Sequence, residues 1–185
     1  MSIASDNFEK FVHRIHELVE TPDSQVVWND HVPDPDNPKQ PRQIDVATPE
    51  RNAAAWKQSF AVLNEVLGEK TSSSVIYIMI GCQASGKSTW ARRKCAEDGA
   101  AIIFDAILVK QTERVPILRA AAHHEVLAVA VWFQTPLQVC LQRNTARRVD
   151  EAVNEQGLRN VFNALEPPQL SEGFLRVVEV KPVDA

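Results

Sequence analysis

The sequence of 185 residues contains no apolar run that approaches the ~20 residues needed to cross a bilayer. Its first residues also lack the basic and then apolar pattern of a secretory signal, so we expect a cytoplasmic protein with no membrane partner. Only three cysteines occur, Cys82, Cys95 and Cys140. Their spacing matches no metal-binding pattern, and an odd, scattered set of this kind is typical of a reducing compartment.

An excess of basic charge is missing as well. Residues 1–70 hold 7 Lys and Arg against 12 Asp and Glu, and residues 71–185 hold 13 against 12. This balance excludes a broad basic surface for long nucleic-acid duplexes and leaves only local contacts open. Hydrophobic residues make up 44% and charged residues 24%, which is ordinary for a globular chain of one domain with an appendage.

One stretch carries a strong chemical signature, the segment Gly81-Cys82-Gln83-Ala84-Ser85-Gly86-Lys87-Ser88, which is followed by Thr89. It fits the pattern G-x-x-x-x-G-K-[ST] at every fixed position, between an apolar strand predicted over 75–80 and a helix predicted over 89–97. In this setting backbone N–H groups cradle phosphates, Lys87 reaches the β and γ phosphates, and Ser88 binds Mg²⁺. We therefore predict that all nine residues from 81 to 89 bind a nucleotide. The alternative is an ordinary turn rich in Gly and Ser.

The rest of the chain alternates between predicted strands and helices. Further strands are predicted over 100–104, 126–133 and 177–180, and further helices over 113–123, from Thr135-Pro136 onward, and over 154–165 until Pro167-Pro168. Alternation of this kind predicts an α/β fold with a parallel sheet and helices on both faces. Upstream we predict a helix from Asp6 to Thr21-Pro22, strands over 25–28 and 43–46 joined by an extended loop over 33–41, and a helix from Thr48-Pro49 to Gly68. The predicted parts are an appendage (1–47), a connecting helix (48–70) and a phosphate-loop domain (71–185).

Two groups outside the loop are candidates for chemistry. Asp105 ends a buried strand, where ligands of open α/β sheets collect, so it can hold Mg²⁺ or accept the proton of an attacking hydroxyl. The alternative is a simple cap of the next segment. Arg143, Arg147 and Arg148 can stabilise charge on a transferred phosphate, or they can form a solvated basic helix end. Arg143 and Arg147 are four residues apart and would share one face of a helix.

Three further residues have weaker signals. His123 and His124 are read as a cap at a helix end in preference to general bases. Cys82 lies in the phosphate loop and can be a reactive thiol, but a small filler residue is the simpler interpretation.

Residues 75–180 resemble the P-loop kinases related to the polynucleotide kinase kinase domain. The similarity rests on segments 81–90, 104–106, 131–137, 143–147, 165–168 and 172–174. It implies ATP and Mg²⁺ as cofactors, and a hydroxyl acceptor for which a nucleic-acid 5′ end is one candidate. It also implies that Arg143 and Arg147 belong to a lid over ATP. The chain departs from many relatives in lacking an additional strand whose Asp is the acceptor base, so Asp105 has to serve two purposes or the activity is weakened.

Residues 17–46 resemble the opening of a restriction-endonuclease-like domain, through segments 28–30, 33–38 and 42–46. Such a nuclease needs Asp45 and a following (D/E)-x-K strand, but a helix start follows here, so we expect a structural or docking appendage without nuclease activity. Four functions remain open: a nucleic-acid kinase, a small-molecule kinase, a nucleotide-binding regulator, and a nucleic-acid-binding platform. Neither the acceptor nor the oligomeric state follows from the sequence.

Overall fold

The computed structural model describes residues 29–32, 42–45, 49–69, 75–98, 101–147 and 152–182. These residues fall into two compact units. The boundary between the units along the chain lies between Leu63 and Asn64, within one helix. The predicted helix from Asp6, the strand over 25–28 and the loop over 33–41 lie outside the described residues. The predicted division into parts at residues 47 and 70 stays a prediction.

The first unit contains a strand pair and most of a long helix. Strands β1 (Asn29–Val32) and β2 (Arg42–Asp45) are antiparallel, with Asn29 opposite Asp45 and Val32 opposite Arg42. The strand predicted over 43–46 therefore lies one residue earlier. Helix α2 (Pro49–Gly68) begins at its proline and ends at its glycine, as predicted.

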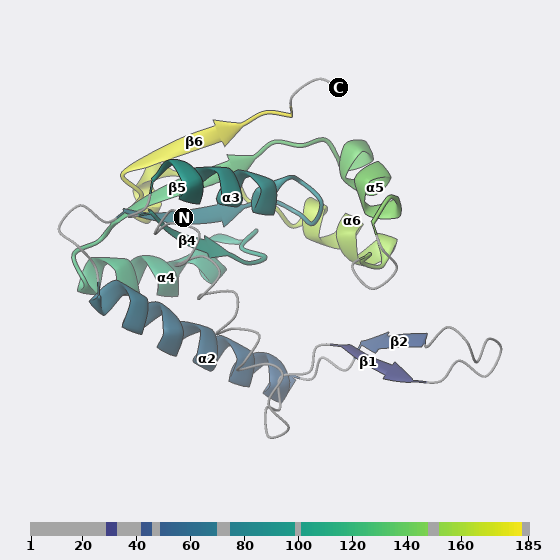
Figure 1. Cartoon of the computed structure of the whole chain (residues 1–185), viewed down its shortest axis with the longest axis horizontal. Coiled ribbons are helices and arrows are strands. Elements are labelled where there is room, and N and C mark those ends of the chain that lie inside the picture. The colour runs from purple at the N-terminus through teal and green to yellow at the C-terminus, as the bar shows by residue number, and fades with distance from the viewer. Residues whose placement is uncertain are drawn as a thin grey trace. The chain divides into compact units, whose positions relative to one another are not determined.

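The second unit is built on a four-stranded parallel sheet (Figure 1). The strands are β3 (Val75–Ile80), β4 (Ala101–Asp105), β5 (Leu127–Phe133) and β6 (Arg176–Val180), in the spatial order β4-β3-β5-β6. Strand β3 lies between β4 and β5, and five of its six residues are buried. Near-continuous apolar runs are typical of parallel strands covered on both faces, so the predicted α/β fold is confirmed.

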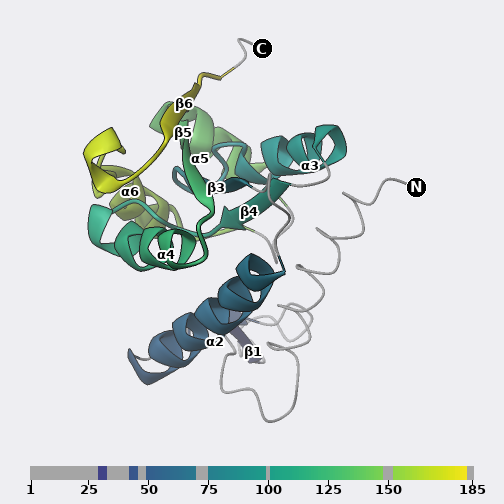
Figure 2. The ribbon, with the colours of Figure 1, turned by 90° about the vertical axis from the view of Figure 1, so that its left-hand side faces the viewer.

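The helices of this unit are α3 (Lys87–Glu97), α4 (Gln111–His123), α5 (Leu137–Thr145) and α6 (Glu155–Asn163), followed by the short 3₁₀ helix η1 (Leu170–Glu172). Figure 2 shows α3 and α4 on opposite sides of the sheet. This arrangement follows from right-handed crossovers, because the chain moves from β3 to β4 in one direction and from β4 to β5 in the other. The predicted layers, with helices on both faces, are therefore present.

Several predicted helix boundaries differ from the structure. Helices α3 and α4 each begin two residues earlier than predicted, and two other boundaries differ in their physical cause. Helix α5 begins after Pro136, which is its N-cap, and Thr135 does not cap it. Instead the Thr135 hydroxyl donates a hydrogen bond to the carbonyl of Ser85, 2.9 Å away. Helix α6 ends at Asn163, before Pro167-Pro168 is reached, and its N-terminus is capped by the side chain of Asn154. The prolines were therefore not needed to end it.

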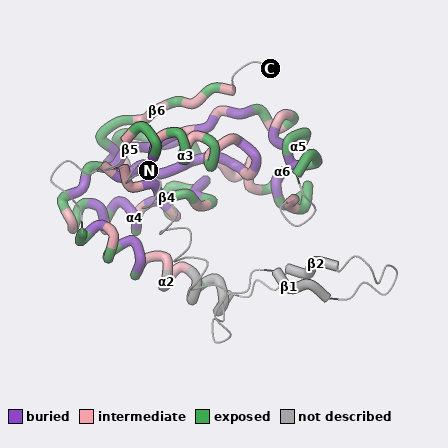
Figure 3. Tube along the Cα trace, in the orientation of Figure 1, coloured by how far each residue is buried: buried purple, intermediate pink, exposed green. Residues whose placement is uncertain are grey.

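The core of the second unit surrounds β3 and β5, whose traces are largely buried in Figure 3. Its largest fully buried apolar side chains include Ile76, Ile78, Ile80 and Val131. Trp132 is only half-buried and lies near the end of β5, opposite Glu179 of β6. None of the helices in the described ranges is long and apolar enough to cross a membrane.

Candidate nucleotide-binding site

The turn between β3 and α3 has the backbone of an anion-binding loop. Ala84 (φ 60°) and Gly86 (φ 102°) are in the left-handed region, which the glycine adopts without strain. Positive φ angles at these positions curl the chain so that successive N–H groups point to a common centre. Gly86 is the N-cap of α3 and no side chain caps this end. The helix N-terminus therefore adds its own N–H groups and its dipole to the loop.

Close packing explains the first glycine of the loop. A Cβ atom on Gly81 would lie 2.9 Å from the Ser85 hydroxyl and 3.0 Å from the Cβ of Phe133. A side chain at this position would therefore force Ser85 or Phe133 to shift, which favours glycine where the loop leaves the sheet. On the other side Thr135, which is 3% exposed, holds the Ser85 carbonyl. The segment that follows β5 thus holds the phosphate loop in place through this hydrogen bond.

Lys87 points back into the loop that precedes it. Its Nζ atom donates hydrogen bonds to the carbonyls of Gly81 and Cys82, each at 2.9 Å. Burial lowers the pKa of Lys87, while the negative charge of Asp105 acts in the opposite direction. The ammonium is therefore held at the centre of the loop.

Asp105 lies at the carboxyl end of β4, next to Ser88 of α3. The Ser88 hydroxyl donates to Asp105 Oδ2 at 3.2 Å. Solvent reaches the carboxylate, yet the surrounding protein removes enough water to raise the pKa of Asp105, against the opposing effects of Lys87 and the Ser88 hydroxyl. Parallel pairing of Met79 with Asp105 places this side chain at the same edge of the sheet as the phosphate loop.

Two of the three candidate arginines reach the same place. An ideal Cβ on Gly86 would lie 3.8 Å from Nη1 of Arg143, which is in the last turn of α5. Arg147 also lines the cavity over the loop. However, α5 ends at Thr145, so the premise that Arg143 and Arg147 share a helix face was wrong. Arg148 lies outside the described residues.

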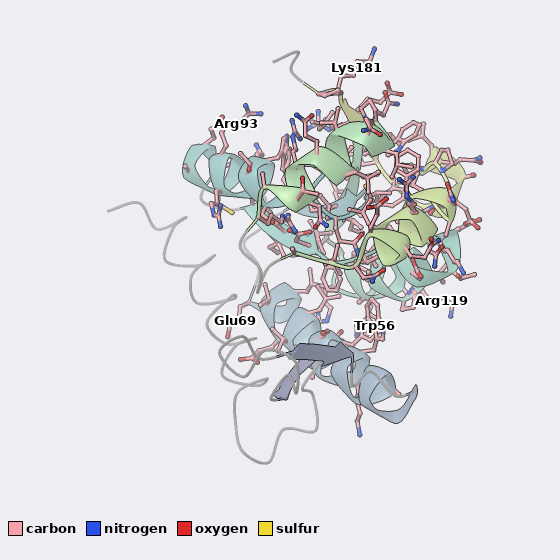
Figure 4. The ribbon with its side chains drawn as sticks, turned by 90° about the vertical axis from the view of Figure 1, so that its right-hand side faces the viewer. Trp56, Glu69, Arg93, Arg119 and Lys181 are labelled. Carbon is pink, nitrogen blue, oxygen red and sulfur yellow. The ribbon has the colours of Figure 1, made fainter. Side chains whose placement is uncertain are left out.

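A cavity of about 630 Å³ joins these groups, within the ~300–1,000 Å³ range of small-molecule sites. Its polar part contains Lys87, Ser88, Asp105, Arg143 and Arg147. Its other part is formed by Trp90, Arg93, Phe133, Val180, Lys181 and Pro182, of which Figure 4 labels Arg93 and Lys181. A lining that combines cationic side chains with the rings of Trp90 and Phe133 suits a phosphorylated compound with an aromatic portion.

The cavity also has the features that a nucleotide and a hard cation require. Gln83 Oε1 and Ser85 Oγ, both in the loop, are buried without a hydrogen-bond partner in the structure. A hydroxyl and a carboxylate, from Ser88 and Asp105, are the oxygen ligands that Mg²⁺ prefers alongside phosphate oxygens. Within the described ranges no three His, Cys, Asp or Glu side chains are grouped to hold a metal alone. Mg²⁺ held by Ser88 and Asp105 would complete its coordination with phosphate oxygens and water.

Comparison with known families supports this assignment. Residues 93–168 match a protein-family model described as an AAA domain, which is less than half of the chain and begins just after the phosphate loop. The matched segment includes Asp105, Arg143 and Arg147. No curated protein sequence matches the chain. Together with the parallel sheet and the loop geometry, the family match indicates that the second unit has the α/β fold of a P-loop NTPase domain.

Seven of the nine loop residues predicted to bind nucleotide, 83–89, line the cavity of this P-loop domain. Gly81 and Cys82 do not line the cavity, and their carbonyls accept hydrogen bonds from Nζ of Lys87. Cys82 instead packs in a small core with Cys140, Leu141 and Leu158. These two loop residues therefore contribute to the site by orienting Lys87.

The histidine pair lies away from this chemistry. His123 is the last residue of α4, and His124 follows as its C-cap. The Nε2 atom of His124 is 3.1 Å from Oδ1 of Asn64. This position agrees with the interpretation as a helix end.

Sequence reasoning missed three polar residues that hold the P-loop domain together. Thr135 was read as a helix cap, and Asn144 was overlooked although its amide both donates to and accepts from the backbone of Val153. Arg114, which forms a buried ion pair with Glu172, gave no signal beyond helix periodicity. A charged residue on a helix normally indicates a solvated face, so only the three-dimensional structure identifies its partner.

Proposed function

We propose that this protein is a kinase, which transfers the γ-phosphoryl group of ATP to a hydroxyl group. The observation that carries the proposal is the convergence of Lys87, Ser88, Asp105, Arg143 and Arg147 on one cavity, from the phosphate loop, β4 and the end of α5. Phosphoryl transfer depends mainly on positioning and on stabilising charge, and these side chains supply both. The acceptor is a nucleic-acid 5′-hydroxyl or the hydroxyl of a small molecule.

Each side chain has a proposed role. The loop N–H groups and the Lys87 ammonium bind the phosphates. Ser88 and Asp105 would hold Mg²⁺, which when bound neutralises charge on the phosphates. Arg143 and Arg147 are exposed cations beside the loop and stabilise the charge that spreads over the transferred group. Asp105 can alternatively accept the proton of the attacking hydroxyl, because it lies at the strand end beyond Ser88.

One observation favours a second candidate, a nucleotide-binding module without transfer. Among the described residues that line the cavity, Asp105 is the single carboxylate. It belongs to β4, which forms one edge of the described sheet, where the resembling kinases have an additional strand with the acceptor base. If Asp105 holds Mg²⁺, no second cavity carboxylate takes the proton.

Labelled ATP and a panel of hydroxyl acceptors separate the two candidates. The panel contains single-stranded DNA and RNA with 5′-hydroxyl ends, nucleosides, sugars and amino alcohols. Transfer that needs Mg²⁺ supports the kinase, whereas nucleotide binding without transfer to any acceptor or to water supports the binding module. Absence of nucleotide binding by the folded protein contradicts both.

The variant Asp105→Asn assigns the role of the carboxylate. If Asp105 is the general base, Asp105→Asn should lower kcat by a factor of ~10²–10⁴ and leave nucleotide affinity unchanged. As a Mg²⁺ ligand, its loss should weaken the Mg²⁺-dependent binding of ATP. Glu155→Gln is the matched control, since Glu155 is an exposed carboxylate on α6 that does not line the cavity. Normal binding and turnover in Asp105→Asn would refute both roles.

A further inference from the structure

Two buried thiols meet directly below the phosphate loop. Cys82, the second residue of the loop, and Cys140 of α5 are 58 positions apart in the sequence, yet their Sγ atoms lie 3.2 Å apart and share a hydrogen bond. Both are free thiols and almost fully buried, with exposed fractions of 2% and 0%. Apolar Leu141 and Leu158 complete the same core. Packing alone explains small apolar residues at these positions, but it does not require two thiols in contact.

The two thiols differ in chemical character. The hydrogen bond between the two thiols lowers the pKa of Cys82; burial raises it and the positive charge of Lys87 lowers it further. The same hydrogen bond and burial raise the pKa of Cys140. Cys82, whose carbonyl binds the Lys87 ammonium, is therefore the sulfur at which a thiolate is favoured, and Cys140 lies in contact with it. Such a thiol with a second thiol at hand is the arrangement of a redox-sensitive pair, which an oxidant would reach when the loop opens to solvent.

The position of the pair connects it to the cavity. The carbonyl of Cys82 accepts a hydrogen bond from Nζ of Lys87 at 2.9 Å. Cys140 lies three residues before Arg143 on α5, so both are on one side of that helix. Joining the sulfurs would bring them from 3.2 Å to the ~2.05 Å of a disulfide, so the two side chains, and the loop and α5 that carry them, must together shift by about 1 Å. Any part of this shift that falls on the loop displaces the Cys82 carbonyl that orients Lys87.

We propose that Cys82 and Cys140 are a peroxide-sensitive modification site, whose disulfide joins the phosphate loop to α5 and reversibly weakens nucleotide binding. The thiolate of Cys82 attacks one oxygen of hydrogen peroxide; an S–O bond forms, the O–O bond breaks, and the departing hydroxide takes up a proton to become water. The sulfur of Cys140 then attacks the sulfenic sulfur of Cys82. The S–S bond forms as the S–O bond breaks, and the leaving hydroxide takes the thiol proton of Cys140. Two thiols and one peroxide thus give one disulfide and two waters.

The test treats the whole reduced protein with hydrogen peroxide and measures two quantities. Intact mass and peptide mapping without reductant should show a loss of two hydrogens and a cross-link between Cys82 and Cys140, which dithiothreitol reverses. Binding of ATP with Mg²⁺ should weaken by about tenfold or more, the effect of losing one charge-assisted hydrogen bond, and should recover on reduction. The second measurement rests on the proposed nucleotide binding, but the first does not.

Variants supply the controls. Cys140→Ala should bind nucleotide normally when reduced, and peroxide should then leave a sulfenic or higher acid on Cys82 without a cross-link. Cys140→Ser serves the same purpose if the alanine variant folds poorly. Cys95→Ala removes the other buried thiol, on α3, and should still form the cross-link.

Three outcomes would overturn the inference. The first is oxidation of Cys95 while Cys82 and Cys140 stay reduced. The second is irreversible oxidation of Cys82 in the parent protein without a cross-link. The third is a complete cross-link that leaves nucleotide affinity unchanged. If the reduced protein binds no nucleotide, the proposed function fails, and the mapped cross-link still decides whether the thiols form a pair.

Discussion

Mutation of the buried ion pair between Arg114 and Glu172 should lower the free energy of unfolding of the P-loop domain more than mutation of an exposed ion pair does. Nε and Nη2 of Arg114 donate to the two carboxylate oxygens of Glu172 at 2.7 and 2.8 Å. Nη1 donates to three carbonyls, those of Leu108, Val109 and Glu166, at 3.1 to 3.3 Å. The side chains are 0% and 2% exposed. The guanidinium of Arg114 therefore connects residues 108–109, which follow Asp105, to Glu166 and Glu172, which precede β6.

The geometry gives the expected magnitude. Glu172→Gln keeps the shape and part of the hydrogen bonding but leaves the arginine charge unpaired, which should cost about 3 kcal/mol of unfolding free energy. Arg114→Met leaves a buried carboxylate and three carbonyls without their donor, so its cost should reach about 5 kcal/mol. Domains of this kind are stabilised by only ~5–15 kcal/mol in total. Arg114→Met should therefore be the more damaging change, and near the limit of folding.

Urea unfolding followed by circular dichroism measures both costs. Arg159→Met is the matched control, because Nη2 of Arg159 is also 2.7 Å from its partner Glu155, on an exposed helix surface. An exposed pair of this type is worth only ~0.3–0.5 kcal/mol. The reasoning is refuted if Arg114→Met and Arg159→Met shift the urea midpoint equally, since burial would then contribute nothing.

Three further changes test the cavity. Lys87→Ala should weaken ATP–Mg²⁺ binding about tenfold or more, through loss of charge-assisted contacts worth ~1.5–3 kcal/mol; calorimetric titration of the folded variant with unchanged affinity would contradict this. Arg143→Ala should lower kcat more than it changes ATP affinity, because a transition-state contact acts on turnover; steady-state kinetics with equal kcat would remove its assigned role. Thr135→Val should destabilise the loop by ~1–3 kcal/mol by leaving the buried Ser85 carbonyl without its donor, whereas Thr135→Ser should be close to the parent in thermal unfolding.

Much of the fold could be predicted because the sequence signals were local. The run Val75 to Ile80, the loop glycines and the strand ending at Asp105 each depend on nearby residues, and the structure contains all of them. The likeness to polynucleotide kinases in particular, and of residues 17–46 to a nuclease, stays a prediction. So does the absence of nuclease activity at Asp45, for which only the backbone is described.

The parts that sequence could not predict depend on contacts between distant segments. Thr135 has the same Thr-Pro signature as Thr48, yet its hydroxyl is used 50 positions away on Ser85. Helix α5 stops at Thr145, before Arg147, and no glycine or proline announces that end. Cys82 contacts Cys140 only because α5 packs against the phosphate loop. Tertiary packing decides all three, and residue propensities carry no information about it.

The direction of the Lys87 side chain has a consequence for selectivity among anions. An ammonium group has three N–H donors, and the loop carbonyls of Gly81 and Cys82 engage two of them. The side chain is thereby aimed before any ligand arrives, so little rotational freedom remains to be lost on binding. A single phosphate oxygen can take the third donor, while a ligand that takes more must compete with the protein's own carbonyls. A ligand that offers one oxygen to Lys87 therefore uses only the third donor, and a ligand that offers more gains the further contacts only in exchange for the carbonyls of Gly81 and Cys82.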